Sequence, residues 1–331
     1  MNYSREEVEK IEQVVKETCV ADNWKDPACV LITTLIVFFL CFYFATKYPS
    51  AGTYLLFGFV IIRLFVIFHD LGHKSFFPTD ERKNNTLGTN ILVSNLIDMF
   101  TLYPAKPWRE GHGYHHKIHG NLNHTDVTKT VITSGEYAKS GFLYKMLYEI
   151  LRFPPIFFAW VPFYSFLISH IQFGYVLYLA KLVAMYFVTL KIGGRPAVRA
   201  LFISSYLAGF FGLMLFHLQH QVNEGYWKKF DNDDPYSKKL ADLTGASVLK
   251  IPWFLEYFTN GIEYHDVHHF NPGVPSYKIK ACYKRLVKKG LIKSKQISYE
   301  KSFKSLFHYI YNEDTERYES PWIFKMLGLE S

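Results

Sequence analysis

Long apolar stretches alternate with polar, lysine-rich stretches along this chain of 331 residues. The two clearest apolar stretches, residues 29–46 and 51–68, contain no charged side chain except Arg63. A helix of 18 residues is about 27 Å long, close to the thickness of the hydrocarbon core of a bilayer. Arg63 lies about 9 Å of helix before His69, so we expect its guanidinium to extend outward toward water. The pattern favours membrane-spanning helices over a soluble bundle with an unusually apolar core.

The loop between these two stretches, residues 48–52, is so short that the stretches must form a helical hairpin with both outer ends on one side of the membrane. Residues 87–103 are only moderately apolar and contain Asn90, Asn95 and Asp98, which predicts an interfacial or partly buried helix. Three further apolar stretches follow, at residues 153–169, 173–190 and 197–216.

The chain is basic, with a formal net charge of +8, and the positive charges concentrate in residues 74–152 and in the part beyond residue 223. The positive-inside rule places both parts on the cytoplasmic side. Attraction to anionic lipid explains the charge better than binding to nucleic acid. Residues 1–28 lack the pattern of a cleavable signal. We expect a polar cytoplasmic N-terminal segment (1–28), a membrane domain (29–286) and a basic cytoplasmic tail (287–331).

The four cysteines form no C-x-x-C pair, and two of them lie in the first apolar stretch. The sequence therefore indicates neither a disulfide framework nor a thiolate metal site. The cysteines are Cys19, Cys29, Cys41 and Cys282.

Two histidine triplets with the pattern H-x-x-H-H stand far apart in the chain. Random placement of the histidines would give only about 0.025 copies of this pattern. On a helix, positions i, i+3 and i+4 share one face, so each triplet can direct three imidazoles toward one point. His69 and His73, at the end of the second apolar stretch, have the i, i+4 spacing and can add two more. The triplet residues are His112, His115, His116, His265, His268 and His269.

Eight imidazoles exceed what one octahedral ion needs, so we expect a two-metal centre with His220 as a ninth ligand. His217 could be a ligand or a partner of one. His119 continues the face of the first triplet and is expected to contact a ligand or to be solvated. His124 and His308 have no partner spacing and are expected to be ordinary histidines. Side chains that could fix a ligand's tautomer are Asp70, Asp266, Asn223 and Asn260.

All these histidines can meet at one centre only if an even number of spans separates residue 152 from His217. Residues 153–169 contain three prolines, Pro154, Pro155 and Pro162, which break a spanning helix. We therefore expect this stretch not to cross, which gives about four transmembrane helices in all. The assignment places three basic residues on the outer face, against the charge rule. They are Lys191, Arg195 and Arg199.

The kind of metal follows by elimination. Catalytic zinc needs only three protein ligands, and its H-E-x-x-H motif is absent. Copper and iron–sulfur sites favour cysteine ligands, and the paired E-x-x-H motifs of soluble di-iron bundles are absent as well. Imidazole suits iron, and two irons can activate O₂. We expect an all-α integral membrane protein whose cytoplasmic helical cap carries a histidine-ligated di-iron site and acts on a lipid-borne substrate.

The same residues carry a family resemblance. Residues 69–77 (HDLGHKSFF) and 108–121 (WREGHGYHHKIHGN) resemble the first two histidine boxes of membrane fatty acid desaturases. Residues 217–227 (HLQHQVNEGYW) are similar to the segment that precedes the third box, and residues 263–277 match the third box with its Pro-x-Tyr tail. The resemblance covers about residues 54–286 and is closest to the acyl-lipid omega-6 (Δ12) and omega-3 types. His217 and Asn223 depart from the family's pattern, which bears on the subtype.

The resemblance implies O₂-dependent desaturation of a long fatty acyl chain, with two non-haem irons, external electrons and no catalytic residue apart from the metal ligands. It suggests that a monounsaturated C18 chain receives a second double bond. The implied partners are a fatty acyl lipid or acyl thioester, membrane lipid, and an electron donor such as ferredoxin or cytochrome b5. The membrane would be the endoplasmic reticulum in a eukaryote or the plasma membrane in a bacterium. An acyl hydroxylase on the same scaffold is the near alternative, and a membrane metal transporter is a remote one.

Overall fold

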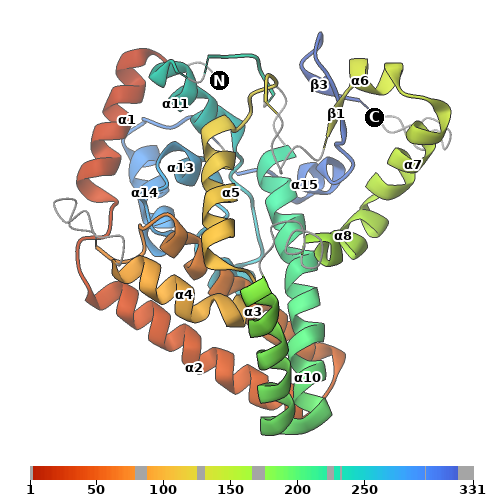
Figure 1. The fold of residues 1–331 in the computed structure, drawn as a ribbon. Coiled ribbons are helices and arrows are strands. Elements are labelled where there is room, and N and C mark those ends of the chain that lie inside the picture. Colours follow the sequence, from red (N-terminus) through yellow and green to blue (C-terminus); the bar gives the residue numbers. More distant parts are fainter. Residues whose placement is uncertain are drawn as a thin grey trace.

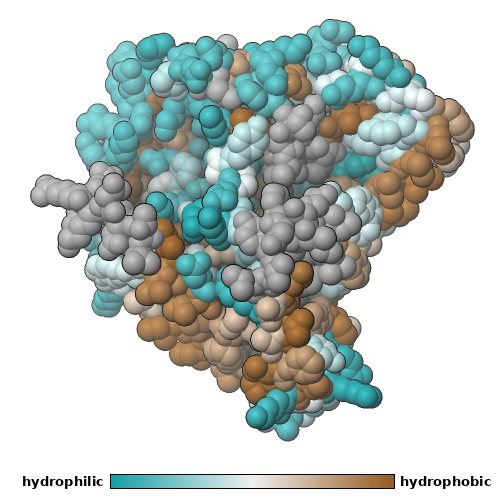
Figure 2. All heavy atoms as spheres, in the orientation of Figure 1, coloured by the Kyte–Doolittle hydropathy of each residue, from teal (hydrophilic) through white to brown (hydrophobic). Residues whose placement is uncertain are grey.

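Long apolar helices form one end of the molecule, and shorter helices form a cap at the other end (Figure 1). The computed structural model describes residues 3–78, 88–124, 131–165, 176–221, 227–231, 233–294 and 296–319. Within these residues, three helices are long and apolar enough to cross a membrane by length and composition. Figure 2 shows apolar surface around these helices and along the right-hand edge, where α7 (Phe142–Arg152) lies, with hydrophilic side chains over the rest of the cap and at the opposite tip.

The first two long helices form the expected hairpin. α2 (Lys25–Lys47) and α3 (Ala51–Gly72) are joined by three residues. Ser50 begins α3 with a capping box in which its hydroxyl accepts a hydrogen bond from the backbone N–H of Thr53 at 3.1 Å. Both helices pack through a shared aromatic and aliphatic core that includes Phe38 and Phe57.

The third long helix, α10 (Val176–Gln221), is folded back on itself at Gly194. Gly194 has a φ of +65°, which glycine adopts at little cost, and Pro196 begins the second arm. Gly193 packs against Thr46, so this turn lies at the same end of the molecule as the turn between α2 and α3. The two arms correspond to the expected stretches 173–190 and 197–216, of which residues 173–175 lie outside the described residues.

Two shorter helices lie in the remaining stretches, at residues 89–101 and 154–163, while residues 166–169 of the stretch 153–169 lie outside the described residues. α8 (Pro154–Phe163) has only ten residues, starts with two prolines and contains Pro162 near its end. α4 (Thr89–Thr101) buries Asn90, Ser94 and Asp98 while Leu92 and Leu96 are more than half exposed. α8 is too short to cross a bilayer in the described residues, and α4 has the amphipathic character of an interfacial helix.

The expectation that Arg63 extends to water is wrong. Its side chain is buried, with Nε donating to Thr34 Oγ1 at 2.8 Å and Nη1 donating to the carbonyl of Tyr257. The guanidinium also lies 4.1 Å from the centre of the Tyr257 ring. Local partners from α2 and α12 (Glu256–Thr259) satisfy the charge inside the protein, so snorkelling is unnecessary.

The cap is held by an apolar core between its N-terminal helix and the segments that follow the second triplet. Val8, Ile11 and Val15 of α1 (Arg5–Thr18) are buried against it. Cys19 and Cys282 form a disulfide that joins α1 to α14, which corrects the expectation of no disulfide. The other cap helices are α5 (Ala105–Ile118), α11 (Pro235–Gly245), η2 (Trp253–Leu255), α13 (His265–Phe270) and α14 (Ser276–Lys288).

The fold is not purely α, because three very short strands form a sheet. β1 (Ile132–Thr133) pairs in parallel with β2 (Ile310–Asn312), which pairs antiparallel with β3 (Arg317–Tyr318). Tyr309 and Tyr311 are fully buried beside Trp227, so this part of the expected tail packs back onto the rest of the protein. The remaining helices here are α6 (Ser134–Lys139), α7 (Phe142–Arg152) and α15 (Tyr299–Ser305).

Candidate metal centre

The cytoplasm-facing end expected for α3 carries the first pair of histidines. His69 and His73 lie one turn apart, at the end of the helix. Asp70 holds this end in two ways: one carboxylate oxygen lies 3.1 Å from His69 Nδ1, and the other accepts the backbone N–H of Ser276 at 2.7 Å. A carboxylate on Nδ1 favours a proton there and leaves the lone pair of His69 Nε2 available.

The first triplet lies on α5, and its histidines belong to two different groups of imidazoles. His112 and His116 stack one turn apart and face His69 and His73. His115 is rotated about 100° from His116 around the helix axis, and it faces a second group of histidines instead.

The second triplet, on the short helix α13, divides in the opposite sense. His268 joins the group formed by the first pair and α5, with its Nε2 3.1 Å from that of His116. His265 and His269 are one turn apart and face His115. One triplet therefore gives two imidazoles to the first group and one to the second, and the other triplet does the reverse.

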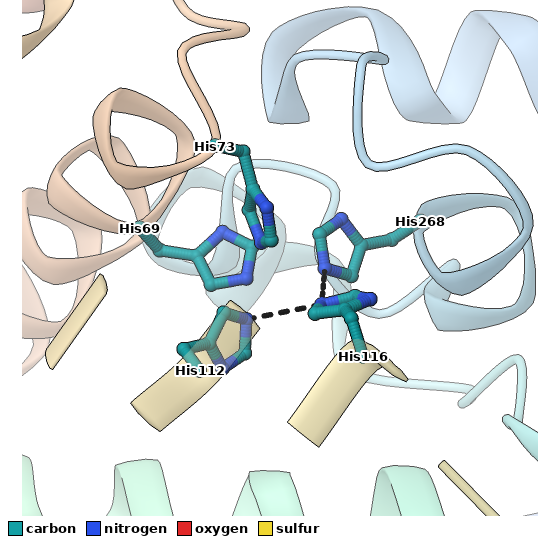
Figure 3. Close-up of side chains that lie close together, drawn as sticks. All are labelled: His69, His73, His112, His116 and His268. Atoms are coloured by element: carbon teal, nitrogen blue, oxygen red, sulfur yellow. Dashed lines mark hydrogen bonds between the residues drawn. The ribbon is translucent and has the colours of Figure 1, made fainter. Parts of the chain in front are cut away.

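We call the first group site A. Its five imidazoles converge from α3, α5 and α13, as Figure 3 shows, and one ring nitrogen from each lies within 4.8 Å of the others. The Nε2 atoms of His112, His116 and His268 form a chain with separations of 3.1 Å. The members of site A are His69, His73, His112, His116 and His268.

The second group, site B, is fully buried and contains four imidazoles. His220, near the end of the second arm of α10, directs Nε2 at His265 Nε2 across 3.1 Å. His269 Nε2 lies 3.1 Å from His265 Nε2 and 3.3 Å from His115 Nε2. Sites A and B adjoin, because the rings of His116 and His269 stack with centres 4.3 Å apart.

The donor set fits two metal ions. Burial holds the pKa of His112, His116, His265, His268 and His269 well below the ordinary value, so these imidazoles are neutral and have a lone pair to donate. Two neutral nitrogens bound at about 2.1 Å and at right angles to one ion are about 3.0 Å apart, close to the separations in both sites. In the described parts of the chain, neither site contains a carboxylate or a thiolate.

The other residues singled out in the sequence lie around the centre or away from it. His217 points out of site B, with Nε2 3.0 Å from the carbonyl of Ser305. Asp266 accepts hydrogen bonds from Ser294 Oγ and the backbone of Val267, and Asn260 donates to Ser276 Oγ. Asn223 lies outside the described residues.

His119 is fully buried beside site B, so the alternative that it is solvated is wrong. Its Nε2 lies 3.2 Å from His220 Nδ1, and its Nδ1 lies 3.5 Å from a carboxylate oxygen of Asp242. The sequence reasoning did not single out Asp242, because its i, i+4 spacing from Lys238 is typical of a surface ion pair.

Two aromatic side chains on the membrane side of the centre were also missed. The Trp108 ring stacks on His112 with centres 4.6 Å apart, and Phe216 lies 4.7 Å from the ring of His220. Each precedes its histidine by four residues, so each lies one helical turn away from it. That i−4 spacing was the signal available in the sequence.

Comparison with known proteins agrees with this geometry. The fatty acid desaturase family matches residues 46–299. A fatty acid desaturase of Bacillus subtilis is 29% identical over 89% of this chain and 86% of its own length. An sn-1 oleoyl-lipid 12-desaturase of a Picosynechococcus species is 27% identical over 72% of this chain and 69% of its own length. A chloroplastic omega-6 fatty acid desaturase of Glycine max is 26% identical over 69% of this chain and 54% of its own length.

Proposed function

This chain belongs to the fatty acid desaturase family and is a membrane enzyme, and we propose that it adds a second cis double bond to a monounsaturated C18 acyl chain. The two relatives whose names specify the oleoyl-lipid 12-position or omega-6 type support this regiochemistry. The overall change consumes one O₂, two electrons and two protons with the CH₂–CH₂ pair, and it yields CH=CH and two waters.

The observation that carries the proposal is the convergence of nine imidazole nitrogens into two adjoining groups, of which site A is partly buried and site B is fully buried. Site A would hold one iron through five histidines, and site B would hold the second through four. When bound, two such irons supply the O₂-activating chemistry that removes one hydrogen from each of two adjacent carbons. Asp70 keeps the His69 ring oriented.

The chain's own contribution to the reaction is position. Trp108 and Phe216 pack against ligands of different sites, on the side of the long apolar helices. Each ring offers an apolar surface to an acyl chain beside one site. Because misplacement of the reacting carbons by about 1 Å can cost 10²-fold in rate, we propose that the positions of these two rings help to select the carbons that react.

We infer the membrane topology from the distribution of apolar surface and from the positions of the α2–α3 turn and the turn in α10. The α2–α3 hairpin and the two arms of α10 make four crossings, with both turns on the outer side. The cap, with sites A and B at its base, faces the cytoplasm. There a soluble or membrane-attached electron donor, such as ferredoxin or cytochrome b5, would supply the electrons. The substrate, a fatty acyl lipid or acyl thioester, enters from the bilayer.

The test is fatty acid profiling after expression in a host that lacks polyunsaturated lipids. Cells fed oleate should accumulate linoleate, whereas stearate alone should not be converted. A hydroxylated product would favour the hydroxylase alternative, and conversion of linoleate instead of oleate would favour an omega-3 enzyme. Conversion of stearate with oleate left untouched would contradict the proposed regiochemistry.

Variants connect the product to the metal centre. His115→Ala in site B or His268→Ala in site A should abolish turnover, because each removes one donor from a group that acts as a unit. His124→Ala is the matched control, since that side chain is exposed. Purified wild type should contain about two irons per chain, as the nine donors imply. Stoichiometric zinc with negligible iron would contradict the proposal.

A further inference from the structure

A tenth imidazole, that of His119, adjoins the centre without belonging to either site. His119 ends α5 one turn after His115, and its ring lies flat on that of His269, with centres 3.7 Å apart and an interplanar angle of 25°. None of its surface is exposed. His119 is a ligand of neither site A nor site B.

The contacts of His119 identify which nitrogen of His220 it serves. His220 uses Nε2 to face site B, so its Nδ1 points to the outside of the site. A ligand that binds through Nε2 keeps its proton on Nδ1. His119 Nε2, 3.2 Å away, is placed to accept that proton in a hydrogen bond.

This role fixes the tautomer of His119 itself. If its Nε2 accepts, its proton is on Nδ1, which faces the carboxylate of Asp242 at 3.5 Å. Asp242 is buried in α11, and the oxygen that faces His119, Oδ1, also accepts a hydrogen bond from Lys238 Nζ, which holds the carboxylate in place. The result is an ordered series of contacts that runs from Asp242 through His119 to His220.

A third metal site at these residues is a poorer interpretation. His119, Asp242 and His269 do offer ligand atoms within 4.8 Å of one another. However, ring nitrogens donate in the plane of the ring, and the rings of His119 and His269 are stacked. Their lone pairs therefore point side by side and do not converge on one ion.

We propose that His119, oriented by Asp242, is a positioning residue for site B. It fixes the His220 ring through Nδ1 and the His269 ring by stacking, and so holds two of the four imidazoles of that site. Within the described residues, no imidazole of site A is held by His119 through a hydrogen bond or by stacking. Site A also has five imidazoles, one more than site B. The identity of the metal rests on the proposed function, but the unequal effect on the two sites does not depend on the substrate.

The experiment measures iron binding by full-length protein in detergent, with Fe²⁺ in competition with a chelator. Loss of such an outer partner typically lowers metal affinity about 10–100-fold. His119→Ala should therefore retain iron in one site and release it from the other at chelator concentrations that leave the wild type loaded. Mössbauer spectra should show one ferrous doublet preserved and the other lost. His124→Ala is the control and should bind like the wild type.

Two further variants separate positioning from packing. His119→Gln keeps a carbonyl oxygen that can accept the proton of His220 Nδ1, so it should restore most of the lost affinity. Asp242→Asn should weaken site B less than His119→Ala does. Wild-type iron binding and an unchanged spectrum in His119→Ala would overturn the proposal. Equal loss from both sites in His119→Ala, without rescue by Gln, would also overturn it. A wild-type protein that binds no iron would instead refute the proposed function.

Discussion

At Gly72, the lack of a side chain determines where a ring of the metal centre can lie. A Cβ atom at this position would be 2.5 Å from Cζ3 of Trp108, which is far inside van der Waals contact. Trp108 in turn stacks on His112. The glycine between His69 and His73 is therefore required by a neighbour on another helix and not by its own backbone conformation.

Gly72→Ala should displace Trp108 and, with it, the ring of His112. We expect turnover to fall at least tenfold, with a loss of stability of about 1–3 kcal/mol, as for an overpacked core. Gly111→Ala is the matched control, because nothing lies within 4 Å of a Cβ there and alanine favours the helix by about 1 kcal/mol. Turnover and melting temperature in detergent measure both effects. Equal turnover in the two variants would contradict the interpretation.

Asp266 gives a prediction about pH. Burial raises its pKa from the ordinary value of 3.8 to about 6. The folded state therefore binds this proton more tightly than the unfolded chain does, and stability falls as the pH rises through that interval. The loss attributable to Asp266 reaches about 3 kcal/mol above pH 6.

Asp266→Asn keeps the neutral shape and removes the titration. Relative to the wild type, the variant should gain stability between pH 3.5 and pH 7, whereas at pH 3.5, below the unfolded pKa of 3.8, the two should be similar. Unfolding midpoints in detergent at both pH values provide the comparison. A difference between variant and wild type that does not change with pH would rule out Asp266 as the source.

At the scale of elements, Arg63 connects the membrane hairpin to the cap. It bonds Thr34 on α2 and the Tyr257 carbonyl on α12, while its own backbone belongs to α3. Phe258, the next residue, packs against Phe59 one turn earlier on α3. A single guanidinium thus holds three elements in register.

Arg63→Met should preserve the volume but leave the Tyr257 carbonyl without this donor, at a cost of about 1–3 kcal/mol. Arg63→Lys should be intermediate, because one ammonium cannot reproduce two separate N–H bonds and the stacking. We expect lower melting temperatures in that order, together with faster proteolysis around residues 250–257. Wild-type stability of Arg63→Met would show that the contact is dispensable.

The sequence predicts elements best where one segment carries the whole signal. The apolar stretches specify α2, α3 and the arms of α10. The prediction that each triplet directs its three rings toward one point is wrong, because each triplet is divided between sites A and B. The step of about 100° between neighbouring helical residues such as His115 and His116 was the local signal for this division. Features that join distant segments carry no local signal. The pairing of Cys19 with Cys282, the strand pairing of Ile132 with Ile310 and the burial of His119 against Asp242 are of this kind.

For the whole molecule, the proposed topology places the two turns opposite the cap. In a background with Cys29 and Cys41 replaced by serine, Lys139→Cys and Lys289→Cys should react with a membrane-impermeant maleimide only from the cytoplasmic side. Lys191→Cys, beside the turn of α10, should react only from the other side. These three lysines are exposed, so labelling reports sidedness and not burial. Labelling of positions 139 and 289 from opposite faces would be incompatible with one shared centre.

The division of each triplet between two sites has a consequence for biosynthesis. His69 and His73 are made early, but their partner in α13 follows almost 200 residues later. At about 5–20 residues per second, translation of that interval takes on the order of 10 s or longer. Neither site is complete before α13 has been translated, since α13 supplies a histidine to each site. We therefore expect iron to be captured in full only by a chain whose long helices have all been synthesised, since each of them precedes α13.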